Sequence, residues 1–297
     1  MAPLRVALLT ALAPLAGCAA IAAPKSAPPS AELAVAALRF DRACGVASRA
    51  QATLSLVTPT ASFRGDAQLL VAVPRSLRLE VQSSFGLALL QLAAEHDMVA
   101  VDPRNRVYSE GPNEPCTLQA WLGLPIPTEL LVSVLRGSVP VIVHDRSSVS
   151  WSGDGAWALT FEGNGLTETV RVDVAPERRD APWTEQSFTV RDAEVRASSR
   201  VLWRLEADKH APAPRAPALV DPDGIDEPVE PSGPACEASL PRRVVLTLPE
   251  RNASLRLDLR DSAWNPPLLP SSFALTRPDG FRREVLRCVE ASPVSYP

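Results

Sequence analysis

The cysteines and histidines of this chain are the first candidates for disulfides, metal binding or catalysis. The sequence of 297 residues contains five cysteines and three histidines. No two cysteines are spaced as Cys-x-x-Cys, and the histidines are scattered, at His96, His144 and His210. Zinc sites usually draw on closely spaced ligand pairs, so no metal site is predicted. The cysteines beyond the first 20 residues are disulfide candidates: Cys44, Cys116, Cys236 and Cys288.

Signatures of catalysis are missing from the sequence. It contains no Gly-x-Ser-x-Gly elbow, no His-Glu-x-x-His, no Gly-rich phosphate loop and no Asp-x-Asp calcium loop. His144 and Asp145 are adjacent, but no nucleophile motif accompanies them, so we interpret the pair as a solvated turn. We therefore expect no catalytic residues and no cofactor, and a protein that is not an enzyme.

The first 18 residues are typical of an export signal. Arg5 precedes a short apolar run, which is below the roughly 20 residues that a membrane-spanning helix needs. The run ends in Leu-Ala-Gly-Cys18, which closely resembles a bacterial lipobox, where the cysteine is acylated and becomes the first mature residue. Several acyl chains on Cys18 would anchor the protein, because each buried methylene contributes about 0.8 kcal/mol. The alternative is a plain secretory signal with an incidental cysteine.

The residues after Cys18 bear on the location. Ala19 and Ala20 follow it, and neither is the aspartate that holds enterobacterial lipoproteins at the inner membrane. By this analogy we expect an outer-membrane lipoprotein that faces the periplasm.

An exported chain folds in an oxidising compartment, where an even number of cysteines favours disulfides. Four cysteines allow three pairings, and the sequence does not select among them. We favour Cys44 with Cys116 and Cys236 with Cys288, because each bond then joins segments on the same side of a Pro-rich stretch at 209–235.

Charge and composition exclude several classes of protein. The chain has 30 Lys+Arg against 34 Asp+Glu, a net charge of -4, so it lacks the basic surface that binds nucleic acid. With 5% aromatic and 22% charged residues and a mean hydropathy of +0.02, it is neither a disordered acidic chain nor a polytopic membrane protein. The composition is instead that of a folded, weakly acidic domain.

Apolar residues alternate with polar ones over many short segments, which predicts a meander of strands. We expect these strands over residues 51–57, 77–82, 87–95, 97–102, 106–109, 148–152, 157–162, 167–174, 187–195, 200–206, 243–248 and 254–259. Allowing for one or two false predictions, the sheet has about 10–11 strands. Arg64-Gly65-Asp66 is interpreted as a turn between strands. Helical patterns occur only over 32–48, 117–122 and 128–136, so the fold class is mainly β, with a few helices packed on one face of an antiparallel sheet.

The domain organisation follows from composition. Residues 1–17 are the signal, and 18–31, rich in Ala and Pro, form a lipidated flexible tether. Residues 32–297 form a single domain. The Pro-rich and acidic stretch at 209–235 is an exposed insertion within it, since Pro excludes a helix or a central strand there.

The segment Ser83-Ser84-Phe85-Gly86 is a turn between two expected strands. A large aromatic residue at the tip of a tight polar hairpin has little core to enter, so Phe85 either projects into solvent or folds back over the edge of the sheet. An exposed Phe85 would need a functional explanation.

Two segments together resemble the family of the outer-membrane lipoprotein receptor LolB. One is Ser-Ser-Phe85-Gly followed by an apolar strand; the other is Gly123-Leu-Pro-Ile-Pro127 leading into a helix that ends in Leu135-Arg-Gly. The resemblance covers roughly residues 32–205 and 240–265. The Pro-rich insertion and the tail beyond Asp261 are not features of the compact receptor.

The resemblance implies an incomplete antiparallel β-barrel around an apolar cavity capped by helices. In that family the cavity accepts acyl chains of lipoproteins delivered by a periplasmic LolA-like carrier, and a projecting apolar loop assists their insertion into the outer membrane. Phe85, with Ser84 and Gly86, matches this loop, with an aromatic side chain in place of an aliphatic one.

The residue pattern agrees with this picture. One face of the strand at 77–82 is apolar, with Leu77, Leu79 and Val81, and the helices carry apolar residues suited to a lid: Trp121, Leu122, Leu130 and Val134. Transfer of an acyl chain would be passive, driven by burial of apolar surface. The alternative is an assembly lipoprotein that uses the same fold to bind a protein partner without lipid transfer.

Overall fold

The computed structural model describes residues 21–223, 227–288, 294 and 296. One large sheet contains the strands β1 (Ala47–Val57), β2 (Ser62–Ala72), β3 (Ser76–Gln82), β4 (Ala88–Ala94), β5 (Asp97–Asp102), β6 (Val107–Pro112), β7 (Arg146–Trp151), β8 (Ala156–Gly163), β9 (Leu166–Val174), β10 (Phe188–Ala197), β11 (Arg200–Asp208), β14 (Arg243–Leu248), β15 (Ala253–Trp264) and β16 (Arg282–Val285). The helices are α1 (Ala31–Phe40), α2 (Pro115–Leu122) and α3 (Thr128–Leu135). Short 3-10 helices cover Pro176–Arg178, Trp183–Glu185 and Pro249–Arg251, and β12 (Ala211–Pro212) pairs with β13 (Ser239–Leu240).

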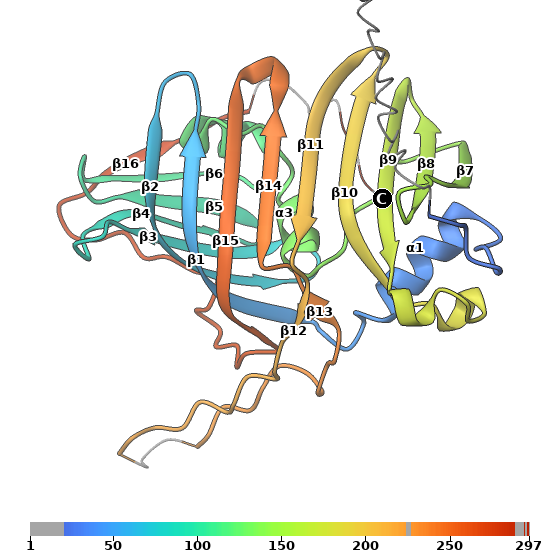
Figure 1. Cartoon of the computed structure of the whole chain (residues 1–297). Helices are drawn as coiled ribbons and strands as arrows, with labels where there is room; N and C mark the ends of the chain where they lie inside the picture. The colour runs from blue at the N-terminus through green and yellow to red at the C-terminus, as the bar shows by residue number, and fades with distance from the viewer. Residues whose placement is uncertain (1–20, 224–226, 289–293, 295, 297) are drawn as a thin grey trace, which may run out of the picture.

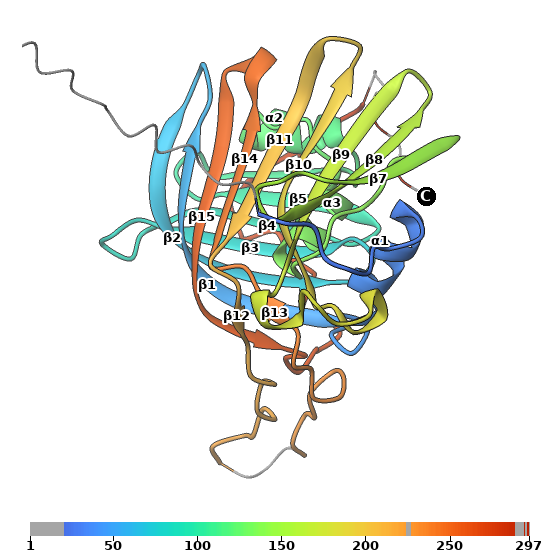
Figure 2. The ribbon, with the colours of Figure 1, turned by 45° about the vertical axis from the view of Figure 1, so that its right-hand side comes forward.

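The 14 strands lie in the order β16-β6-β5-β4-β3-β2-β1-β15-β14-β11-β10-β9-β8-β7 (Figure 1). All neighbours are antiparallel except β16 and β6, which are parallel. The sheet curls into an incomplete barrel, and α2 and α3 lie inside the curve (Figure 2). The predicted fold class is confirmed, and the sheet has more strands than the 10–11 expected.

Alternation of apolar and polar residues gives the sheet one buried face. In β9 every second residue from Leu166 to Val174 is buried, and β8 and β14 alternate in the same way. Successive side chains of a strand point to opposite faces, so the buried set of each strand lines the inner face, which is the face toward α2 and α3. α1 packs at the far end of the sheet against β7, β8 and β10. Among the described residues, no helix is long and apolar enough to span a membrane.

The prediction of a turn at Arg64-Gly65-Asp66 is wrong, because these residues lie within β2. A side chain on Gly65 would place its Cβ 2.4 Å from the carbonyl oxygen of Gln82 on β3. Glycine is therefore required for β2 and β3 to approach each other here. A polar, glycine-containing segment concealed this strand in the sequence.

The first helix is shorter than the expected 32–48. The side chain of Ser30 caps it by accepting a hydrogen bond from the Leu33 N–H at 3.3 Å, and the helix ends at Phe40. Gly45 then packs directly on the indole of Trp264, where an added Cβ would lie 2.3 Å from the ring. The chain therefore turns at Gly45 and enters β1 at Ala47.

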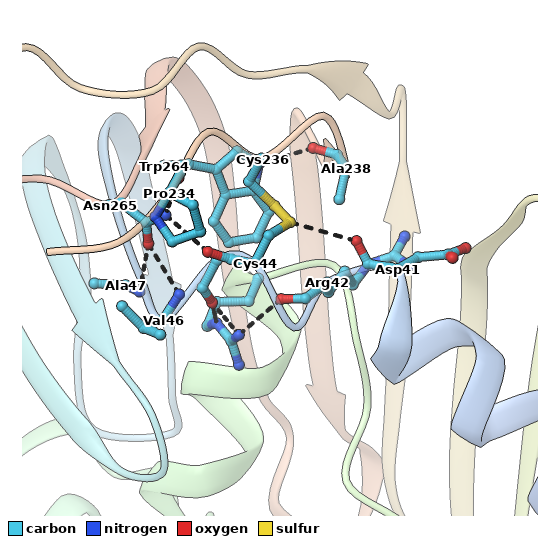
Figure 3. The surroundings of a disulfide bond; sticks show 12 residues. Asp41, Arg42, Cys44, Val46, Ala47, Pro234, Cys236, Ala238, Trp264 and Asn265 are labelled. Atoms are coloured by element: carbon cyan, nitrogen blue, oxygen red, sulfur yellow. Dashed lines mark hydrogen bonds between the residues drawn. A yellow bond between two sulfur atoms is a disulfide. The ribbon is translucent and has the colours of Figure 1, made fainter. Parts of the chain in front are cut away.

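The predicted disulfide pairing is wrong. Cys44 bonds to Cys236, with a Cα–Cα distance of 5.2 Å (Figure 3), and Cys116 bonds to Cys288, with a Cα–Cα distance of 5.8 Å. Each bond joins a residue before the insertion to a residue after it. For Cys44 and Cys236 the reason is topological. β1 pairs with β15, so the start of β1 lies beside Trp264, against which Cys236 also packs.

Asn265 holds this meeting point together. Its amide donates to the carbonyl oxygens of Cys44 (2.8 Å) and Pro234 (2.7 Å), and its Oδ1 accepts from the N–H of Val46 at 2.9 Å (Figure 3). The side chain is fully buried, so these bonds satisfy polar groups that water cannot reach. The described part of the insertion extends from the sheet between these anchors, with Leu219 paired to Val229.

The tail after β15 covers an edge of the sheet. It runs past Arg78, which donates to the carbonyl oxygen of Ser272 at 3.3 Å, and then forms β16 beside β6. The Cys116–Cys288 bond fixes this tail to α2. β6 is thus paired on both sides, and the edge is instead formed by β16, a short strand with three charged residues, which disfavours aggregation.

Candidate functional site

The inner wall of the barrel lies where the sequence pattern placed it. Leu77, Leu79 and Val81 of β3 are at most 5% exposed and join the main core. Leu79 pairs with Leu69 of β2 and with Leu92 of β4, so the apolar row continues across neighbouring strands. A continuous apolar surface therefore lines the concave side of the sheet.

α2 and α3 cover this wall. Pro115 begins α2, and Gly123, with a φ of 69°, ends it in the left-handed conformation that glycine accommodates. Of the expected lid residues, Leu122, Leu130 and Val134 are buried in the same core, and Trp121 is partly buried against it. The structure thus brings the expected wall and lid residues together.

The lid is closed in this structure. The space between the wall and the two helices is about 20 Å³ and is lined by leucines of both, including Leu54, Leu131 and Leu255. One water molecule needs a cavity of roughly 10–15 Å³, so this space admits about one water and no acyl chain. Binding of an acyl chain on the inner wall requires α2 and α3 to move.

Two contacts hold the lid in place. The Thr128 hydroxyl at the start of α3 donates to Oδ1 of Asn113 at 2.6 Å, and the Asn113 amide donates to the carbonyl oxygen of Glu95 at 2.9 Å. At the other end of α3, Arg136 donates to the carbonyl oxygen of Gly45 at 3.0 Å. Hydrogen bonds to other parts of the fold therefore hold α3 at both of its ends.

Phe85 projects into solvent and is 88% exposed. Ser83 organises the turn beneath it: its Oγ accepts from the Leu87 N–H at 3.1 Å, and its carbonyl oxygen accepts from the Gly86 N–H at 2.9 Å. Gly86 has a φ of 75°, a conformation that favours glycine. Ser84 and Gly86 are exposed beside it, so the loop presents one aromatic ring on an uncharged turn.

The tip of this hairpin extends beyond its neighbour. β4 pairs with β5 only from Gln91 to Ala94, so the preceding residues of β4 have no strand on that side. Leu87, which immediately precedes β4, is 68% exposed. Figure 2 shows the β3–β4 loop projecting from the side of the sheet. Phe85 and Leu87 together form an apolar tip that packing in the monomer does not explain.

Glu168 is a polar residue of the inner face that the sequence analysis missed. It lies on β9 between Leu166 and Val170, is 0% exposed, and accepts a hydrogen bond from the Ile142 N–H at 2.8 Å through Oε2. Its Oε1 has no partner among the described residues. Burial raises the pKa of Glu168 to about 8, against the opposing effect of the Ile142 N–H. The strict alternation of β9 could have placed it inside.

Further polar atoms lie buried without partners among the described residues. They include the indole Nε1 atoms of Trp121 and Trp157. Burial raises the pKa of Tyr296, and the negative charge of Glu168 adds to this effect. Trp203 and Glu168 lie in one row of the sheet, since both pair with Val195. This row gives the apolar interior a small polar region.

The other residues singled out in the sequence belong to the export signal, the tether and the His144 turn. Cys18 lies outside the described residues. Within the expected tether, Ser26 accepts from the Trp183 N–H at 3.0 Å, so this part of the segment lies against the domain. His144 packs edge-on against Phe161, with ring centroids 4.9 Å apart. No group of three His, Cys, Asp or Glu residues in the described part of the chain could hold a metal.

The fold and these features define an open half-barrel with an apolar inner face, a helical lid and an exposed aromatic tip. No protein-family model matches the sequence, and no curated protein matches it. Among solved structures, a DUF1329 family protein from Desulfovibrio piger overlaps with a TM-score of 0.49 at 7% identity, over 83% of this chain and 98% of that one.

Two further structures overlap at a similar level. One is described as an outer membrane lipoprotein-sorting protein domain from Vibrio parahaemolyticus, with a TM-score of 0.47 at 12% identity over 82% of this chain and 97% of that one. The other is a LolA superfamily protein from Nitrosomonas europaea, with a TM-score of 0.45 at 11% identity over 84% and 99%. Each is a protein that this chain resembles in the course of its backbone.

Proposed function

We propose that the protein is an outer-membrane lipoprotein, anchored through Cys18, that accepts acyl chains of other lipoproteins on its inner face and helps insert them into the membrane. The observation that carries the proposal is the exposure of Phe85 at the tip of the β3–β4 hairpin. Burying a Phe side chain contributes about 1.5–3 kcal/mol, so Phe85 gives the tip a foothold in the acyl boundary of a bilayer.

The inner face supports the same proposal. It supplies an apolar surface for acyl chains once α2 and α3 move away. In the closed form the lid is held by burial of its apolar side chains in the core and by polar contacts such as Thr128 to Asn113. Transfer then runs toward the site that buries the chain best, and no nucleotide is needed. A periplasmic LolA-like carrier is the proposed donor.

The test is incorporation of a labelled acylated lipoprotein into vesicles in the presence of the protein. Phe85→Glu places a charge at the tip and is expected to abolish incorporation while the fold is retained. The matched control is Val220→Glu, which changes a residue that is 60% exposed on the insertion. Equal incorporation by both variants would remove the proposed role of Phe85.

A second function, in which the protein is an assembly lipoprotein that binds a protein partner, is favoured by the closed lid. The inner space of about 20 Å³ leaves no room for a chain. Photo-crosslinking from position 220 on the insertion distinguishes the two functions. A single envelope protein captured there, together with no lipoprotein incorporation, would support the assembly function.

A further inference from the structure

A pocket of about 800 Å³ lies at the opposite end of β3 from Phe85, bounded by α1, α3, the turn before β3 and the tail residues Val294 and Tyr296. Its charged lining consists of four arginines and two glutamates: Arg39, Arg42, Arg75, Arg136, Glu114 and Glu129. The whole chain carries a net charge of -4, so this excess of positive charge is a local feature. A concave site with an excess of one sign of charge concentrates ligands of the opposite sign.

Arg42 is buried and Arg136 is half-buried, and neither forms an ion pair with a described residue. Arg42 is 3% exposed and donates to the carbonyl oxygens of Leu38 (3.0 Å) and Phe188 (3.2 Å). Its Nε has no partner within the described residues. In the same part of the chain, Arg136 donates only to the backbone carbonyl oxygens of Arg42 and Gly45. Buried cations are usually paired with a carboxylate, because burial of an unpaired charge is costly.

The surroundings of Arg42 and Arg136 disfavour their positive charges. Burial lowers the pKa of both Arg42 and Arg136 to about 10. For Arg42, the negative charge of Asp41 opposes the effect of burial and the positive charge of Arg136 adds to it. A bound anion would stabilise both guanidinium groups.

The other two arginines are placed to contact a ligand. Arg39 is exposed and forms no ion pair with any described residue, and Arg75 is 4.0 Å from the carboxylate of Glu129. Guanidinium groups bind phosphate oxygens through paired hydrogen bonds. The pocket thus offers the guanidinium groups of Arg39 and Arg75 to a ligand, in addition to the buried Arg42 and the half-buried Arg136.

An apolar groove adjoins this pocket. Its volume is about 590 Å³, it shares Arg39 with the charged pocket, and it runs between α1 and the segment at 141–144. Phe40 is 80% exposed and Val143 44% exposed along it. A cationic pocket beside an apolar groove fits a ligand with a negative head and a hydrocarbon chain.

We propose that this pocket binds the phosphate of an anionic membrane phospholipid, with one acyl chain lying in the groove beside α1. The site goes beyond the lipoprotein function, because it uses neither the lid leucines nor Phe85. Its ligand is a lipid of the membrane itself rather than the acyl chains of a protein.

The test uses the full chain carrying Cys18→Ser, incubated with vesicles of phosphatidylglycerol or of phosphatidylcholine, then separated and analysed by native mass spectrometry. The expected result is about one phosphatidylglycerol per protein and at least tenfold less phosphatidylcholine. In Arg39→Gln/Arg75→Gln the retained phosphatidylglycerol should fall at least tenfold. The matched control, Arg104→Gln/Arg277→Gln, removes the same charge from exposed positions elsewhere and should retain the lipid.

Two further experiments test the acyl chain and the phosphate of the proposed ligand separately. Val143→Asp should lower lipid retention if the acyl chain lies in the groove, and Val57→Asp, at another partly exposed valine, should not. Inorganic phosphate at millimolar concentration should not displace the lipid. Complete displacement would identify a site for free phosphate and overturn the lipid assignment.

Equal retention of the two lipids, or an unchanged result for the arginine variant, would also overturn the proposal. These readouts do not involve lipoprotein transfer. Failure of the proposed receptor function therefore leaves this test intact, and failure of lipid retention leaves the receptor function untouched.

Discussion

The carboxylate of Glu168 accepts a hydrogen bond from the backbone N–H of Ile142 at 2.8 Å inside the apolar core of the half-barrel. This contact ties the segment that follows α3 to the inner face of β9. A carboxyl group in such surroundings is more stable in the neutral form, which is why burial raises its pKa to about 8.

Glu168 makes the stability depend on pH. In the unfolded chain the carboxyl ionises near its ordinary pKa of 4.5, and in the folded protein near 8. The folded state therefore binds more protons between these values, so the stabilising contribution is full below about pH 4.5 and is lost as pH rises toward 8. The slope is at most about 1.4 kcal/mol per pH unit.

The variant Glu168→Gln, which cannot ionise, should lose this dependence. Denaturant unfolding of both proteins at pH 5 and pH 8 is the measurement. The stability of the wild type relative to the variant should fall between these two pH values. A constant difference would contradict the account of Glu168.

Phe85 should matter for membranes and little for folding. Because its ring is 88% exposed, Phe85→Ser is expected to change the free energy of unfolding by no more than about 0.5 kcal/mol. Vesicle co-sedimentation of the Cys18→Ser chain should weaken with this change, since the apolar tip is lost. Val220→Ser serves as the control. A clearly lower free energy of unfolding for Phe85→Ser would instead show that Phe85 belongs to the core.

The disulfides provide a covalent test of the topology. Peptide mapping of the non-reduced protein should recover Cys44 linked to Cys236 and Cys116 linked to Cys288. Loss of either bond by a Cys→Ser pair should cost about 2–5 kcal/mol, toward the upper end because each closes a loop of more than 170 residues. Recovery of Cys44 linked to Cys116 would contradict the structure.

The lid should open more readily when its buried hydrogen bond is removed. Thr128→Val keeps the shape of the side chain and leaves Oδ1 of Asn113 without its 2.6 Å donor, at a cost of about 1–3 kcal/mol. Hydrogen exchange of the α3 amides should accelerate while exchange in β9 and β10 is unchanged. Uniform acceleration across the sheet would indicate global destabilisation and no separate lid motion.

Local sequence patterns predicted most of the strands and all three helices, because alternation and turn residues are local properties. β2 escaped prediction because Gly65, between two charged residues, imitates a turn, and only its close approach to Gln82 reveals a strand. Likewise Glu168 is buried by a tertiary contact with Ile142, which lies 26 residues away in the chain.

The disulfide pairing could not be predicted for a related reason. Cys44 meets Cys236 only because β1 and β15 are neighbours in the sheet, and Cys116 meets Cys288 only because β16 returns to pair with β6. Sequence order favoured partners on the same side of the insertion. Phe85 was placed at a hairpin tip, but its exposure depends on β4 extending beyond β5.

The most direct test of the receptor function is transfer of an acylated lipoprotein to the protein itself. The Cys18→Ser chain is mixed with its own organism's periplasmic carrier, loaded with a lipoprotein that is labelled on its acyl chains, and the label is followed. We predict that the label moves to the folded chain without nucleotide and that Thr128→Val accepts it faster. Label that stays on the carrier in the presence of folded protein would contradict the central claim and favour the assembly function.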